Sequence, residues 1–186
     1  GNVVQGNRIG ADVTGTLGLP NRLAGLVLDS AAVNLIGGST AGAANLISAN
    51  LSDGIWLYGY GANGNVLRGN RVGLALGSDA PLGNYGHGIR LLEGAYSNTI
   101  GGSEPADANT IAFNLDAGLC VESRFILNPP TFRNRFTGNS IFSNGGLGID
   151  LAPVGVNLND PGDGEWGANE LLNRPALQAA YGGPGG

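Results

Sequence analysis

Three ionisable side chains occupy comparable places in segments of the sequence that resemble one another. Arg90, Glu122 and Asp150 each lie within or directly after a short Gly-apolar-x-apolar stretch. A pair of carboxylates on either side of a glycosidic bond is what an inverting glycosidase uses, and an arginine pairs with the charge of a uronate. We therefore name Glu122, Asp150 and Arg90 as candidate catalytic residues. A polysaccharide lyase would instead need a base, often Lys or Arg, and the chain has no lysine.

Two aromatic residues occur in the same kind of stretch, as Trp56 and Tyr58, and Asp29 has the corresponding place one segment earlier. Aromatic faces stack on sugar rings, and a carboxylate accepts hydrogen bonds from sugar hydroxyls. Trp56, Tyr58 and Asp29 are therefore candidate sugar-binding residues. The alternative is that they are the solvated residues of an exposed strand. His87, just before Gly88, is expected to be a turn residue, and Cys120 is expected to be incidental because no histidine is assigned beside it.

A third candidate site lies near the C-terminus, where residues 159–170 read NDPGDGEWGANE. The segment is rich in oxygen ligands, with Gly164 in the sixth place and Glu170 in the twelfth, as in a calcium loop. Asp160, Asp163 and Glu165 are the candidate ligands for Ca²⁺. However, Pro161 occupies the third place, where an oxygen ligand is expected, and the alternative is an Asx-rich turn that caps the fold.

The elements that must position these residues recur at intervals of about 30 residues, which is the range of solenoid repeats. Each repeat opens with the same Gly-apolar-x-apolar stretch, followed by two Asn-x-apolar units. The opening glycines are Gly25, Gly54, Gly88, Gly118 and Gly148. We expect each opening glycine to start one coil of the fold.

Asparagines recur in three columns, one for each side of a coil. The columns are Asn2, Asn34, Asn65, Asn98 and Asn134; Asn7, Asn45, Asn70, Asn109 and Asn139; and Asn21, Asn50, Asn84, Asn114 and Asn144. Stacked asparagine side chains can bond to one another and to the turn backbone. Asparagine also tolerates the left-handed conformation, so we expect it to make the sharp corners itself.

Short strands of alternating pattern cannot bury an apolar face alone, but they line one interior when stacked about 4.8 Å apart. The sequence therefore predicts an all-β parallel β-helix (solenoid) of about five coils with three short strands per coil. Residues 1–152 form the coils, and residues 153–186 form an irregular C-terminal cap or a linker to a further domain. Stacking would bring Trp56, Arg90, Cys120 and Asp150 into one outward row.

The units Asn34-Leu-Ile-Gly-Gly38 and Asn45-Leu-Ile-Ser-Ala-Asn50 resemble the right-handed parallel β-helix repeats of bacterial secreted and cell-surface proteins. These proteins share the pectin-lyase-like architecture. The resemblance implies right-handed winding and an extracellular or cell-surface location. It does not select a function, because the architecture hosts lyases, hydrolases, epimerases, adhesins and spacers.

The formal net charge of −5 and nine scattered arginines give no basic stripe, so nucleic acid is not an expected partner. No segment has the apolar length needed to span a bilayer. We predict a structural or carbohydrate-binding module whose partner is a polysaccharide or other glycan. One alternative is a carbohydrate-active enzyme, a polysaccharide lyase or glycoside hydrolase, that uses the outward face of the first strands. Another is a structural spacer that self-associates end to end.

Overall fold

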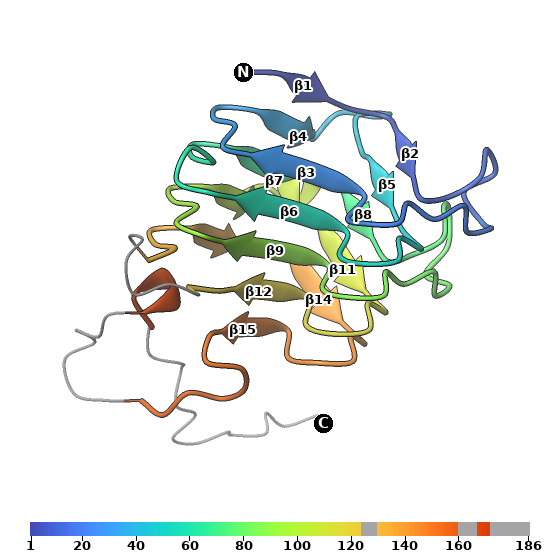
Figure 1. Cartoon of the computed structure of the whole chain (residues 1–186). Coiled ribbons are helices and arrows are strands. Elements are labelled where there is room, and N and C mark those ends of the chain that lie inside the picture. The colour runs from blue at the N-terminus through green and yellow to red at the C-terminus, as the bar shows by residue number, and fades with distance from the viewer. Residues whose placement is uncertain (124–129, 160–166, 172–186) are drawn as a thin grey trace, which may run out of the picture.

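The computed structural model describes residues 1–123, 130–159 and 167–171, which form a parallel β-solenoid with almost no helix (Figure 1). Its three sheets have five strands each, and every neighbouring pair of strands within a sheet is parallel. The predicted all-β solenoid of about five coils with three strands per coil is therefore confirmed. Right-handed winding stays a prediction from the resemblance. No helix in the described part of the chain has the length and apolar character to cross a membrane.

Each coil gives one strand to each sheet. The sheet that follows the opening glycines, called the opening sheet below, contains β3 (Leu26–Asp29), β6 (Ile55–Tyr58), β9 (Ile89–Leu92), β12 (Leu119–Val121) and β15 (Ile149–Leu151). The second sheet contains β1 (Val3–Val4), β4 (Leu35–Gly37), β7 (Val66–Arg68), β10 (Thr99–Gly101) and β13 (Arg135–Thr137). The third contains β2 (Arg8–Ile9), β5 (Leu46–Ile47), β8 (Arg71–Val72), β11 (Thr110–Ala112) and β14 (Ser140–Phe142). Two short 3₁₀ turns are η1 (Pro105–Asp107) and η2 (Ala168–Leu171).

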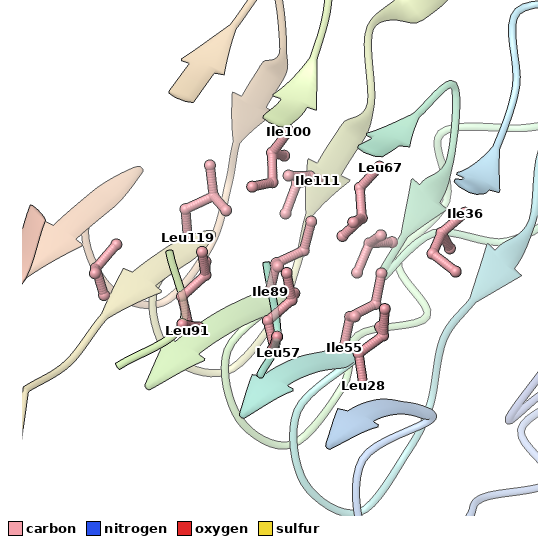
Figure 2. Packing of buried hydrophobic residues seen from close by; sticks show 14 of the residues in the cluster. Leu28, Ile36, Ile55, Leu57, Leu67, Ile89, Leu91, Ile100, Ile111 and Leu119 are labelled. Carbon is pink, nitrogen blue, oxygen red and sulfur yellow. The ribbon is translucent and has the colours of Figure 1, made fainter. Parts of the chain in front are cut away.

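The apolar residues stack in ladders inside the coil (Figure 2). Leu57 pairs in register with Leu28 and Leu91, and both Leu57 and Leu91 are fully buried. The other two sheets contribute matching ladders, in which Ile36 lies beside Leu67, and Ile47 beside Val72. Burying one such side chain stabilises the fold by about 1.5–3 kcal/mol, so the stacked coils hold one another in place.

The asparagine columns form hydrogen-bonded ladders, as predicted. Asn65 donates both its backbone N–H and its Nδ2–H to Oδ1 of Asn98, at 3.0 and 2.9 Å. The same pair of bonds joins Asn34 to Asn65 and, in the second column, Asn70 to Asn109. Because these side chains are buried, their hydrogen bonds are needed to offset the loss of hydration. The repeat therefore fixes the register between coils.

One expectation about the asparagines is wrong. The left-handed residue at many corners is the residue before the ladder asparagine: Val33 has φ 59°, Ala49 has φ 58° and Ser97 has φ 53°. The ladder needs the amide and side chain of each asparagine directed at the next coil. The bend therefore falls on the preceding residue.

A segment beyond the last strand extends the first asparagine ladder. Asn134 donates its backbone N–H to Oδ1 of Asn169 at 2.8 Å, and Asn169 is itself left-handed, with φ 51°. Ala168 is 1% exposed and belongs to the apolar core. The described residues 167–171 thus pack against the last coils. Whether residues 153–186 as a whole form a cap or a linker stays a prediction.

Candidate functional site

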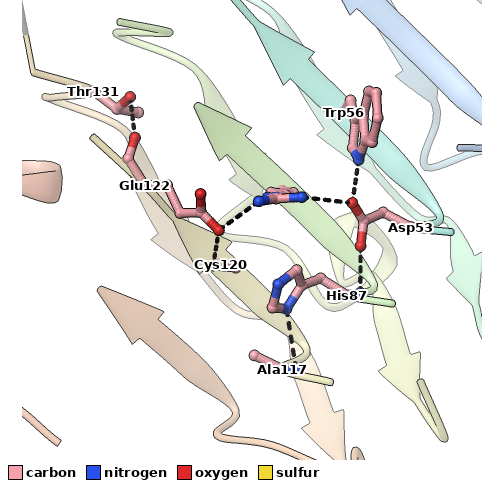
Figure 3. Close-up of polar contacts among 8 residues, drawn as sticks. Asp53, Trp56, His87, Ala117, Cys120, Glu122 and Thr131 are labelled. Carbon is pink, nitrogen blue, oxygen red and sulfur yellow. Dashed lines mark hydrogen bonds and ion pairs between the residues drawn. The ribbon is translucent and has the colours of Figure 1, made fainter. Parts of the chain in front are cut away.

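The outer face of the opening sheet holds a cluster of polar side chains (Figure 3). The register is the predicted one, since Trp56 pairs with Arg90, Arg90 with Cys120, and Cys120 with Asp150. Two further side chains join this row, Asp53 and His87. Each precedes an opening glycine, so the corner of the coil directs it toward the strands that follow.

Asp53 is the centre of the cluster, and its side chain is only 3% exposed. Its Oδ2 accepts a hydrogen bond from Trp56 Nε1 and lies 3.4 Å from Arg90 Nη1. Its Oδ1 accepts a bond from the backbone N–H of His87 at 2.5 Å. A buried carboxylate needs such donors to offset its desolvation. Asp53 therefore fixes the position of both the indole and the guanidinium.

Arg90 is held between two carboxylates. Its Nη2 lies 2.7 Å from Oε1 of Glu122, its Nη1 contacts Asp53, and its side chain is 14% exposed. Burial alone would lower the pKa of Arg90, but the charges of Glu122 and Asp53 raise it above its usual value. Arg90 is a fixed cation, and Glu122 is engaged in an ion pair.

Cys120 and His87 are closer together than the sequence suggested. Ligand atoms of His87, Cys120 and Glu122 all lie within 4.8 Å of one another, so the expectation that Cys120 has no histidine beside it is wrong. Burial, with Glu122 as the next cause, raises the pKa of the Cys120 thiol to about 12. At neutral pH the thiol is protonated and is not an activated nucleophile.

These three side chains do not fit a metal ion well. His87 Nδ1 accepts a hydrogen bond from the backbone N–H of Ala117 at 3.2 Å. With Nδ1 as the acceptor, a neutral imidazole carries its proton on Nε2, so that nitrogen is a donor and not a ligand. Glu122 is already paired with Arg90. The group is better described as part of the hydrogen-bonded cluster.

The outward row is exposed at its N-terminal end and covered at its C-terminal end. Tyr58 is 41% exposed, Trp56 is half-buried and Asp29 is exposed, whereas Cys120 is 2% exposed. Asp150 is also buried, and its Oδ1 accepts a bond from Gly155 N–H at 3.0 Å. The surface open to a large ligand is therefore the part with the aromatic residues. The catalytic roles of Glu122, Asp150 and Arg90 stay predictions.

An aromatic stack follows the opening sheet, and the sequence reasoning did not find it. The ring centroids of Tyr60 and Tyr96 are 4.8 Å apart, and those of Tyr96 and Phe132 are 5.2 Å apart. Tyr60 is exposed and lies two residues after Tyr58 on the chain. An alignment of the corner residues of successive coils would have indicated neighbouring rings.

The candidate calcium ligands Asp160, Asp163 and Glu165 lie outside the described residues, so the calcium site stays a prediction. Comparisons with protein-family models, curated proteins and solved structures gave no significant match.

Proposed function

We propose that this solenoid is a carbohydrate-contacting module of an extracellular or cell-surface protein, built from pectin-lyase-like repeats with right-handed winding. The contact surface is the N-terminal part of the outer face of the opening sheet. The observation that carries the proposal is the bond from Trp56 Nε1 to Asp53, which fixes a half-buried indole beside the exposed ring of Tyr58.

The chemistry of this surface suits a sugar ring. Trp56 and Tyr58 are two residues apart on one strand and therefore point to the same side of the sheet. Asp29 pairs in register with Tyr58, and Val27, which is 44% exposed, pairs with Trp56. Apolar faces next to a carboxylate can take the C–H face of a sugar and one of its hydroxyls. Fixing the indole beforehand lowers the entropy cost of binding.

Binding is favoured over catalysis by the state of the charged groups. Glu122 is paired with Arg90, and Asp150 accepts a bond from the backbone of Gly155. An inverting hydrolase would need one carboxyl to protonate the leaving group and the other to activate water. A carbohydrate-active enzyme at this face would therefore have to break the Arg90–Glu122 ion pair on binding substrate.

The proposal is tested by fluorescence titration of Trp56 in a Trp166→Phe background, using neutral cello-oligosaccharides and acidic oligogalacturonates. Binding should change the emission, and Tyr58→Ala should weaken the apparent affinity about tenfold. The matched control is Tyr85→Ala, since Tyr85 is 64% exposed and lies at another corner. If a glycan array selects a ligand whose binding is unaffected by Tyr58→Ala, the surface is wrongly placed.

The same samples distinguish the alternatives. Release of reducing or unsaturated sugar ends, lost in Glu122→Gln or Asp150→Asn, would establish an enzyme. An apparent molar mass from light scattering that rises with protein concentration, without any response to saccharides, would establish a self-associating spacer.

A further inference from the structure

A second site lies on a different face, outside the third sheet, where a groove of about 220 Å³ is hollowed between loops. Two arginines, Arg8 on β2 and Arg71 on β8, line it, together with Leu46, Leu76, Asn45 and Gly42. This volume is below the roughly 300 Å³ of a drug-sized pocket, so it suits a ligand of about one ring.

The strand register places both arginines on the same side of the sheet. Leu46 of β5 pairs with Arg8 on one side and with Arg71 on the other. Residues in register on parallel strands point the same way, and two strand spacings separate the arginine backbones by about 10 Å. Both side chains are long enough to meet a ligand placed over Leu46 between them.

The loops that follow two strands of the third sheet make the groove apolar on one side. The backbone N–H of Leu76 bonds to the carbonyl of Gly15 at 2.9 Å, which joins the loop after β8 to the loop after β2. A methyl group built on Gly15 would lie 3.0 Å from Leu46 and 2.6 Å from Leu76, so the three residues are packed closely. Leu46 is 2% exposed although it lies on the outer face of the sheet.

The two guanidinium groups differ in their partners. Arg71 bonds through Nη2 to Asp79 Oδ1 at 3.2 Å and to the carbonyl oxygens of Ala75 and Ser78, which holds its side chain in place. Arg8 is exposed and makes no ion pair with any residue in the described part of the chain. Asp79 is 76% exposed, so solvent screens its pair with Arg71 and a ligand can compete with it.

We propose that this groove binds a carboxylate carried on a body of one ring, independently of the sugar-contacting surface on the opening sheet. Planar guanidinium groups match the geometry of a carboxylate, and Leu76, which is 38% exposed beside the buried Leu46, takes the ring. The ligand is either an acidic monosaccharide or an apolar cyclic acid, since both share this chemistry.

The test is a ¹H–¹⁵N NMR titration of the full chain with glucuronate and with cyclohexanecarboxylate. The neutral controls are glucose and cyclohexanol. At least one acid should shift the amides of Arg8, Leu46 and Arg71, and the acid that binds identifies the source of the carboxylate. Arg8→Gln should weaken binding about tenfold, because it removes a charge-assisted contact. Asp79→Asn should strengthen binding, because it removes the competing carboxylate.

The matched control is Arg135→Gln, an exposed arginine on the second sheet, which should leave binding unchanged. Far-UV circular dichroism checks that each variant is folded. If Arg8→Gln does not fold, the tighter binding expected of Asp79→Asn tests the proposal instead. The proposal is overturned if neither acid shifts these amides, if the neutral compounds shift them equally, or if Arg135→Gln weakens binding as much as Arg8→Gln. The emission of Trp56 is a separate readout, so failure here leaves the sugar-contacting proposal standing.

Discussion

Asn134 donates its backbone N–H to Oδ1 of Asn169, and Asn169 donates its Nδ2–H back to the carbonyl oxygen of Asn134 at 3.0 Å. The two residues are 35 positions apart, and Asn169 belongs to no repeat. A segment beyond the coils thus satisfies the last member of a buried ladder.

Asn169→Ala should lower the free energy of unfolding by about 1–3 kcal/mol, because it leaves the buried N–H of Asn134 without an acceptor. Urea denaturation followed by circular dichroism measures the change. The control is the neighbouring Glu170→Gln, which removes only an exposed pair with Arg133 at 4.0 Å and should cost less than about 0.5 kcal/mol. Equal effects of the two substitutions would contradict a role for the ladder.

Gly73→Ala should destabilise the solenoid by about 3 kcal/mol or more. Its φ is +88°, and an added Cβ would lie 2.0 Å from the carbonyl oxygen of Ala112 on the next coil. The matched control is Gly77→Ala, which has φ +71° but nothing within 4 Å of the added Cβ. Gly77→Ala therefore carries only the backbone strain, about 1 kcal/mol. Thermal melts of both variants measure the difference, and similar melting temperatures would show that the coils are not so closely stacked.

Asp53→Asn should destabilise the fold by about 3 kcal/mol, because it removes one partner of a largely buried ion pair and places an amide N–H₂ against other donors. The emission of Trp56 should also shift to the red as the indole loses its fixed place. Both changes are measured in Trp166→Phe protein, with urea unfolding and steady-state fluorescence. Asp29→Asn, on the exposed end of the same sheet, is the control and should change neither quantity. An unchanged Trp56 spectrum in Asp53→Asn would contradict the role of Asp53.

The thiol of Cys120 should make the folding stability of the protein depend on pH in the alkaline range. Its pKa is raised from 9.0 to about 12, so the folded state holds this proton more tightly than the unfolded state. The corresponding stability is fully present below pH 9 and is lost as the pH rises from 9 toward 12. Thermal melts between pH 8 and pH 11 should show the loss, and Cys120→Ala should flatten it. A Cys120→Ala variant with the same pH dependence would mean that other groups cause it.

Much of the fold could be predicted because residues at the same position of successive repeats become neighbours on adjacent strands. Trp56 and Arg90 are 34 residues apart, yet the recurrence of the opening glycines placed them side by side, as the strand pairing confirms. Alternation also predicted which residues point outward. It could not predict that Cys120 and Asp150 are buried, because burial depends on contacts outside the strand pattern. His87 and Glu122 lie beside Cys120, and the turn at Gly155 bonds to Asp150.

The centre of the site was missed because it lies at a corner and not on a strand. Asp53 and His87 share one place in the repeat, directly before the opening glycine, where other coils have Ala24, Ala117 and Leu147. A carboxylate and an imidazole at a position that is apolar in the other coils were the signal that the sequence offered for this site. No such signal exists for Asn169, since its segment has no counterpart in the other coils.

The most direct test of the sugar-contacting surface is the indole N–H resonance of Trp56 in ¹⁵N-labelled Trp166→Phe protein. A glycan selected by array should shift this resonance together with the amides of Val27 and Tyr58. Amides on the second sheet should stay in place. A selected glycan that binds while the Trp56 indole and these two amides remain unmoved would contradict the account.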